Sequence, residues 1–209
     1  MVRSIPLAAI ACLIVLGGCA SLSESQCLAD DWQTIGYSDG LQGKQTSALL
    51  KHQNACIKHG VAPDRDGYLS GWHEGIAQYC QPANGFAVGK RGSGYANVCP
   101  EQLQPAFFAA YQDGRQLYLA RAEINNLERQ IDRSQRQLNK VKSALVEAES
   151  LLIDGDLTSQ ERRQVLEQTK DLAKEQGQLE TEIEDMKIEA AVKDDRLQSL
   201  RHALTYNSA

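Results

Sequence analysis

The sequence lacks the patterns that mark several common classes of function. No order of serine, histidine and aspartate indicates a catalytic triad, and the glycines between 85 and 94 lack the strand-to-helix setting of a nucleotide-binding loop. The formal net charge is −5, which argues against a nucleic-acid-binding surface. Beyond the N-terminus, no apolar run is long enough to cross a bilayer. We therefore expect a protein that is not an enzyme, binds no nucleic acid and uses no cofactor.

An apolar segment does occur at the N-terminus. Arg3 precedes the run Leu7–Leu16, whose length is typical of a signal-peptide core and too short for a membrane span. The run ends in Leu16-Gly17-Gly18-Cys19, which resembles the bacterial lipobox, where small residues precede a cysteine that receives a diacylglyceryl group. The alternative is an ordinary signal peptide followed by a chance cysteine. We expect residues 1–18 to be a signal peptide and Cys19 to be the lipidated N-terminus.

The lipobox resemblance also implies a location. Two or three acyl chains on Cys19 give stable anchoring, whereas one chain binds a membrane only marginally. Ala20 and Ser21 follow, without an aspartate, and by the sorting rule known for such lipoproteins this favours the outer membrane over the inner one. We expect a lipid anchor in the outer membrane, with the chain facing the periplasm.

Four cysteines remain after Cys12 in the signal peptide and Cys19 are set aside. They are Cys27, Cys56, Cys80 and Cys99. An even number in an exported chain indicates two disulfides, for which three pairings exist. If the first two helices are antiparallel, the start of one lies beside the end of the next, which brings Cys27 to Cys56. Cys80 ends a predicted helix, and Cys99 immediately precedes the next one. We therefore predict the pairs Cys27–Cys56 and Cys80–Cys99.

The composition changes near residue 115. Twelve of the 16 glycines and both tryptophans lie between 20 and 115, whereas residues 117–206 contain no proline and are rich in Glu, Gln, Arg, Lys and Leu. This predicts an all-α protein in which a disulfide-braced helical head, 19–115, precedes a long antiparallel coiled-coil hairpin, 116–209. Capping and breaking residues predict head helices at about 31–43, 47–59 and 63–80, irregular structure over 81–99 and a long helix from Pro100.

An aromatic residue followed three positions later by glycine recurs in the head. Examples are Tyr37–Gly40, Trp72–Gly75, Phe86–Gly89 and Tyr111–Gly114. Glycine costs roughly 1 kcal/mol in a helix interior, so its repeated use indicates close helix contact. The alternative is a ligand groove, for which the candidate residues are Trp32, Tyr68 and Trp72.

The head contains a set of short motifs in a fixed order, which are Asp31-Trp32, Ile35-Gly36-Tyr37-Ser38-Asp39-Gly40, Ala55-Cys56, Gly60-Val61-Ala62-Pro63-Asp64, Tyr68, Gly71-Trp72, Gly75, Tyr79-Cys80, Asn84-Gly85-Phe86, Val98-Cys99-Pro100, Ala110-Tyr111, Gly114-Arg115 and Leu117-Tyr118. In these motifs the head resembles a family of bacterial lipoproteins of unknown function with a Cys-, Gly- and aromatic-rich N-terminal domain. The resemblance covers about 27–118 and is fairly specific in order and spacing. It implies no activity.

The second half shows the 3,4 spacing of a coiled coil in two arms. The first arm runs from Leu117 to Leu152 and the second from Val165 to Leu204, with a turn near 154–157. If the chain folds back at Gly155, residues whose numbers sum to 310 face each other. The pairs are Leu145–Val165, Val141–Thr169, Leu138–Leu172, Ser134–Gln176, Ile131–Leu179, Leu127–Ile183, Ile124–Met186 and Ala120–Ala190. Leu197, Leu200 and Leu204 would then reach Ala106, Phe107 and Ala110. An intermolecular coiled coil is the alternative.

A few polar residues could be taken for a site. His52, Cys56 and His59 share a helix face and, with His73, could be read as metal ligands, but we expect Cys56 in a disulfide, the histidines on the surface and no metal. Asp39, Asp64, Asp66 and Glu74 could include an acid–base pair, although Asp64 and Asp66 are better explained as helix-start residues.

These patterns lead to an expected function. We expect an envelope lipoprotein, bound to the membrane through Cys19, that acts as a non-enzymatic tether or scaffold and binds an envelope protein through its coiled coil. The alternative is a module whose head aromatics bind a ligand or glycan. The sequence does not name the partner.

Overall fold

The computed structural model describes residues 22–154 and 156–204. The predicted signal peptide, 1–18, and Cys19 lie outside this part of the chain. Every regular element in the described residues is helical, so the predicted fold class is confirmed. The helices are α1 (Glu24–Leu28), α2 (Trp32–Leu41), α3 (Ala48–Cys56), the 3₁₀ helix η1 (Ile57–His59), α4 (Arg65–Tyr79), α5 (Pro82–Lys90), α6 (Gln104–Asp154) and α7 (Ser159–Ala203). No helix among them has the length and apolar character needed to cross a membrane.

Contacts divide the chain into two compact units, with the division between Gln78 and Tyr79. Unit 1 contains α1, α2, α3, η1 and most of α4, and unit 2 contains α5, α6 and α7. The division by contacts therefore falls inside the segment that composition had marked as one head.

Helix boundaries in unit 1 follow the capping residues seen in the sequence. Asp31 caps α2 by accepting a hydrogen bond from the backbone N–H of Thr34 at 3.0 Å. At the end of η1, Gly60 has φ +74°, a left-handed conformation that glycine adopts without strain. Asp64 accepts hydrogen bonds from the backbone N–H groups of Asp66 and Gly67 at the start of α4.

The prediction of irregular structure over 81–99 is wrong for its first half, which forms α5. Pro82 occupies the first turn of this helix, where its missing N–H costs nothing. The glycines that suggested a loop instead bring α5 against α6: a Cβ added at Gly89 would lie 2.1 Å from the carbonyl oxygen of Tyr111. Packing between helices thus outweighs the low helix propensity of glycine. The long helix begins at Gln104, rather than at Pro100.

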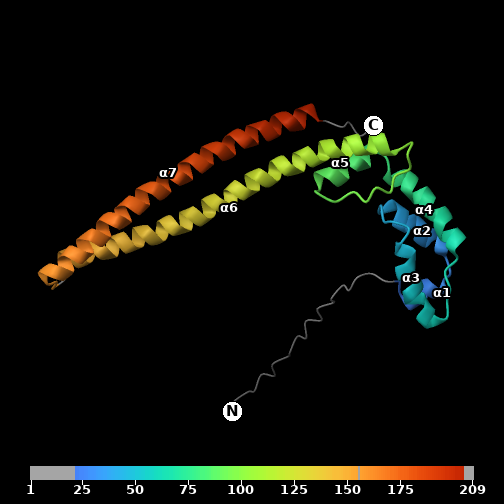
Figure 1. Ribbon diagram of the computed structural model, residues 1–209, viewed down its shortest axis with the longest axis horizontal. Coiled ribbons are helices and arrows are strands. Elements are labelled where there is room, and N and C mark those ends of the chain that lie inside the picture. The colour runs from blue at the N-terminus through green and yellow to red at the C-terminus, as the bar shows by residue number, and fades with distance from the viewer. Residues whose placement is uncertain (1–21, 155, 205–209) are drawn as a thin grey trace, which may run out of the picture. The chain divides into compact units, whose positions relative to one another are not determined.

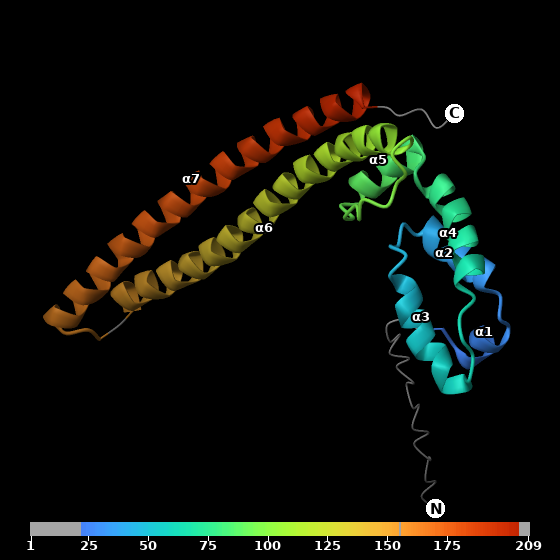
Figure 2. The same ribbon diagram turned by 45° about the vertical axis from the view of Figure 1, so that its right-hand side comes forward.

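Helices α6 and α7 form the predicted hairpin, and they lie side by side in both Figure 1 and Figure 2. They contain 51 and 45 residues, which correspond to about 76 and 68 Å at 1.5 Å per residue. Thr158 caps α7 in a reciprocal arrangement with Glu161. Every predicted contact position, from Leu117 to Leu152 and from Val165 to Leu204, is buried or half-buried.

The predicted register is wrong, because polar contacts between the arms join residues whose numbers sum to more than 310, as in Gln137 with Glu175 and Glu123 with Lys193. The apolar cluster in the middle of the hairpin lacks Leu172, the predicted partner of Leu138; it contains Leu127, Ile131, Leu138, Leu179, Ile183, Met186 and Ala190. Ile124 packs with Leu117 and Leu197 rather than with Met186. The reason lies in the turn: α6 continues through Asp154 and α7 starts only at Ser159, so the centre of the turn lies beyond Gly155.

The end of α7 also packs elsewhere than predicted. Leu197, Leu200 and Leu204 belong to a cluster with Leu117 of α6 and Phe86 of α5, not with the predicted residues 106–110. The shifted register explains this difference. Each α7 residue meets an α6 residue that lies nearer the turn than the predicted partner.

Candidate functional site

Two glycines on each helix bring α2 and α4 into backbone contact. A Cβ added at Gly36 would lie 1.9 Å from the carbonyl oxygen of Tyr68, and one added at Gly71 would lie 1.9 Å from that of Gln33. Gly40 and Gly75 meet in the same way, one turn further along both helices. Because later residues of α2 face later residues of α4, the two helices run in the same direction.

Unit 2 contains a second helix pair of the same design. A Cβ at Gly85 would meet the carbonyl oxygen of Phe107 at 2.4 Å, and a Cβ at Gly114 would meet that of Phe86 at 2.1 Å. In both pairs each helix carries a small residue, an aromatic residue, two further residues and a glycine. The four segments are Gly36–Gly40, Gly71–Gly75, Gly85–Gly89 and Ala110–Gly114. One disulfide also lies in each unit.

The two helix pairs differ in the polarity of two equivalent buried positions. Asp39 of α2 is 3% exposed and stands where α5 has Val88, also 3% exposed. Tyr68 of α4 stands where α6 has Phe107, and both are fully buried. Unit 2 therefore builds this packing with apolar side chains, and the packing alone does not require the buried carboxylate and hydroxyl groups of unit 1. This contrast makes Asp39 and its neighbours the candidate site.

Asp39 lies at the centre of a polar cluster, which we call the Asp39 cluster. Its Oδ2 accepts a hydrogen bond from the Tyr68 hydroxyl at 2.9 Å and lies 2.7 Å from Nε2 of His52. Its Oδ1 accepts from Nζ of Lys44 at 2.8 Å. Tyr68 and His52 are buried, whereas Lys44 is partly exposed. The cluster thus connects α2, α3, α4 and the segment after α2.

The surroundings of Asp39 keep its carboxylate ionised. Burial raises the pKa of Asp39, but the hydrogen bonds from His52, Lys44 and Tyr68 outweigh burial and hold the pKa at about 2. Burial, together with the hydrogen bond to Asp39, raises the pKa of the Tyr68 hydroxyl above its ordinary value. Asp39 is therefore an acceptor of three hydrogen bonds and a poor general base, because an effective base has a pKa near the working pH. The arrangement serves to fix three helices against one another.

His52 corrects an expectation from the sequence. It is only 5% exposed, whereas the histidines were expected on the surface. Its Nδ1 atom is buried and has no hydrogen-bond partner among the described residues. Because Nε2 faces a carboxylate, the ring donates from Nε2 to Asp39 and leaves Nδ1 as the unpaired acceptor in the neutral form.

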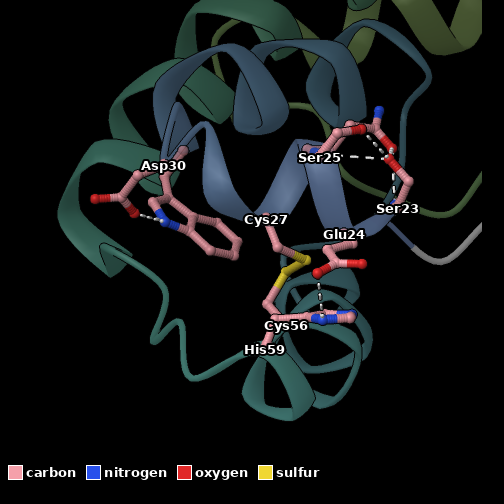
Figure 3. The surroundings of a disulfide bond; sticks show 9 residues. Ser23, Glu24, Ser25, Cys27, Asp30, Cys56 and His59 are labelled. Carbon is pink, nitrogen blue, oxygen red and sulfur yellow. Dashed lines mark hydrogen bonds and ion pairs between the residues drawn. A yellow bond between two sulfur atoms is a disulfide. The ribbon is translucent and has the colours of Figure 1, made fainter.

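The second fixed point of α3 is the disulfide between Cys27 and Cys56. Figure 3 shows this bond between α1 and the end of α3, with a Cα–Cα distance of 5.3 Å. The ring of His59 lies 3.6 Å from the carboxylate of Glu24, next to the disulfide. The other bond joins Cys80 and Cys99. Both predicted pairings are confirmed.

In the described part of the chain, the three aromatic residues that suggested a groove are buried. Trp32, Tyr68 and Trp72 are 1%, 0% and 8% exposed, so their rings fill the interior of unit 1. Their polar atoms are also used: the indole N–H of Trp72 donates to the carbonyl of Lys44, and that of Trp32 donates to Asp30. These side chains therefore line no open groove.

The residues that could have formed a metal site or an acid–base pair do not share one environment. Cys56 is bonded to Cys27, and the described residues contain no group of three or more His, Cys, Asp or Glu side chains placed to hold a metal. Asp39 is buried, whereas Asp64, Asp66 and Glu74 are exposed.

Comparison with known protein families gives a match to the first half of the chain. Residues 31–116 match the profile of a family described as "Protein of unknown function (DUF2799)". The matched segment covers both glycine-packed helix pairs and the Asp39 cluster. No curated protein and no solved structure matches the chain. The match over residues 31–116 thus supports a family of unknown function, in agreement with the resemblance found in the sequence.

Proposed function

We propose that this chain is an outer-membrane lipoprotein of the bacterial cell envelope that acts as a non-enzymatic tether. In this proposal Cys19 carries the lipid, and the α6–α7 hairpin is an arm that binds an envelope protein. The signal-peptide and lipobox pattern supports the anchor, and the pKa of Asp39, far from neutrality, supports a structural rather than a catalytic role for the buried cluster.

The observation that carries the proposal is the apolar surface of the turn end of the hairpin. Val146, Leu151, Ile153 and Leu166 are 66%, 47%, 80% and 46% exposed. Single exposed apolar residues are ordinary, but four of them within some twenty residues of one tip indicate an interaction surface.

Arginine side chains lie next to these apolar residues. A hollow of about 350 Å³ at the start of α7 is lined by Leu157, Ser159, Arg162, Arg163 and Leu166. Protein interfaces are enriched in arginine, and an apolar surface with arginine at its edge fits another protein. We define the hairpin tip as 146–166 and propose it as the site that contacts the partner.

A position-dependent crosslink in living cells tests this function. A photoreactive residue in place of Ile153 should give a discrete adduct with another protein, whereas one in place of Val192, which is also 64% exposed, should not. Val146→Asp should abolish the adduct, and Ile188→Asp should leave it. If both positions give the same adducts, or neither gives any, the hairpin tip is not the binding site.

The anchor is tested separately. Cys19→Ser should abolish labelling by palmitate and release the chain from membranes or leave it unprocessed. If the substituted protein still labels with palmitate and stays with the membrane fraction, the lipoprotein assignment is wrong.

A further inference from the structure

Helix α3 and η1 present an exposed face that is both apolar and basic. The opposite face of α3 is buried and carries His52 and Cys56. On the exposed face Leu50 is 62% and Ile57 is 65% exposed. Lys51 and Lys58 lie beside them. Leu50 and Ile57 are seven residues apart, and so are the two lysines, so the two apolar residues share one stripe of the helix surface and the two lysines share the next. We call these four residues the α3 face.

The charge around the α3 face differs from that of the whole chain. The protein has 27 acidic residues and a net charge of −5, yet no Asp or Glu occurs between Asp39 and Asp64, where three lysines are found. Neither Lys51 nor Lys58 forms an ion pair with any residue in the described part of the chain. The acidic group on the neighbouring helix α1 is Glu24, and it faces His59. The α3 face therefore has unpaired positive charge next to apolar side chains.

We propose that the α3 face rests on the surface of the bilayer that holds the lipid anchor. Leucine and isoleucine side chains partition into the boundary between headgroups and acyl chains, and lysine side chains are attracted to anionic headgroups. Another protein would have to match both features, whereas an anionic phospholipid surface offers them everywhere.

The covalent chain keeps the α3 face close to the anchor. From Cys19 to Ser23, the cap of α1, the chain spans at most about 14 Å when fully extended. The four further residues to Cys27 add about 6 Å of helix, and the disulfide brings the Cα of Cys56 within 5.3 Å of that of Cys27. Ile57 follows directly. The end of α3 is thus held within about 25 Å of the lipidated residue, a span shorter than the thickness of one bilayer.

Two buried connections hold α3 in the orientation that this contact needs. The Cys27–Cys56 bond fixes its end, and the hydrogen bond from His52 to Asp39 fixes its middle. Both lie on the buried side of α3, opposite Leu50 and Ile57. We therefore assign to the Asp39 cluster, which unit 2 lacks, the role of holding the α3 face in a fixed orientation.

This inference rests on the proposed lipid anchor, and quenching of tryptophan fluorescence tests it independently. Full-length protein carrying Ile57→Trp is reconstituted into vesicles of phosphatidylethanolamine and phosphatidylglycerol that contain brominated acyl chains. The matched control carries Val192→Trp, at a position of α7 that is 64% exposed. The wild-type chain gives the background from Trp32 and Trp72, which are buried. The Ile57→Trp signal should be quenched beyond that background, and the Val192→Trp signal should not.

Charge variants complete the experiment. Each lysine near an anionic surface strengthens membrane binding about fivefold. Lys51→Gln with Lys58→Gln should therefore lower, by about 25-fold, the ratio of molecules whose α3 face contacts the bilayer to molecules whose α3 face does not. Lys140→Gln with Lys174→Gln, on the hairpin, should leave the quenching unchanged. Vesicles of phosphatidylcholine alone, which lack anionic headgroups, should give weaker quenching of the Ile57→Trp signal.

The two proposals fail in distinguishable ways. If the protein labels with palmitate and stays in the vesicles but the Ile57→Trp signal is not quenched, the anchor stands and the seating of the α3 face is overturned, as it would be if a protein occupied that face. If palmitate labelling is absent but quenching is seen, the anchor is wrong and the α3 face still binds lipid. Equal quenching at positions 57 and 192 would overturn the inference as well.

Discussion

Adding one methyl group at Gly36 should separate α2 from α4. The new Cβ would lie 1.9 Å from the carbonyl oxygen of Tyr68, and ordinary contact begins near 3.4 Å, so the two backbones must move apart by about 1.5 Å. Overpacking of this kind costs roughly 1–3 kcal/mol, and the upper end applies because both atoms belong to helical backbones. Alanine also has a higher helix propensity than glycine, which offsets about 1 kcal/mol of this loss of stability. We expect Gly36→Ala to destabilise unit 1 by about 2 kcal/mol.

Tryptophan fluorescence in urea measures this effect without interference from unit 2. The chain has two tryptophans, Trp32 and Trp72, and both belong to unit 1. With a slope near 1 kcal/mol per molar urea, typical of a small domain, the midpoint should fall by about 2 M. Gly177→Ala is the matched control, because nothing apart from the adjacent backbone of α7 itself lies within 4 Å of its Cβ position. It should stabilise the hairpin by about 1 kcal/mol and leave the fluorescence transition where it is. A Gly36→Ala midpoint at or above that of the wild type would refute the close-packing argument.

Three further predictions follow from the same contacts. Because the pKa of Asp39 is about 2 in the folded chain, against an ordinary value of 3.8 for an aspartate side chain, its stabilising contribution is complete above about pH 4 and disappears as the pH falls toward 2. The urea midpoint should fall over that range, and Asp39→Asn should remove most of the dependence; an unchanged slope would contradict the assignment. Replacing Cys27 and Cys56 by alanine should destabilise unit 1 by about 3 kcal/mol in the fluorescence assay, given a sequence separation of 29 residues, and a loss below 1 kcal/mol would argue against this bond as a main support of α3. Ser134 and Gln176 are half-buried polar residues of the hairpin, so Ser134→Leu with Gln176→Leu should raise its melting temperature, and amides around 132–136 and 174–178 should exchange faster than their neighbours in the wild type; equal exchange would exclude a weak point there.

Features that depend on local spacing or on counting could be predicted from the amino-acid sequence. The helical class and the two arms follow from a 3,4 spacing in residues 117–204, because that period alone selects the face each helix buries. The two disulfides were predicted from an even number of cysteines placed at expected helix ends. Caps such as Asp31 and Gly60 determine helix boundaries through the backbone groups next to them.

Features that depend on a partner far away in the sequence could not be predicted in this way. Residues 82–90 form a helix because α6 lies against Gly85 and Gly89, a contact that local propensity does not contain. The hairpin register depends on where the turn is centred, and a shift of one or two residues there changes every pair along the two arms. His52 looks like a surface residue in its own segment, and only the fold brings it to Asp39, thirteen positions away. A buried polar group is stable only beside its partner, and that partner is chosen by the packing of α2, α3 and α4, rather than by the sequence around either residue.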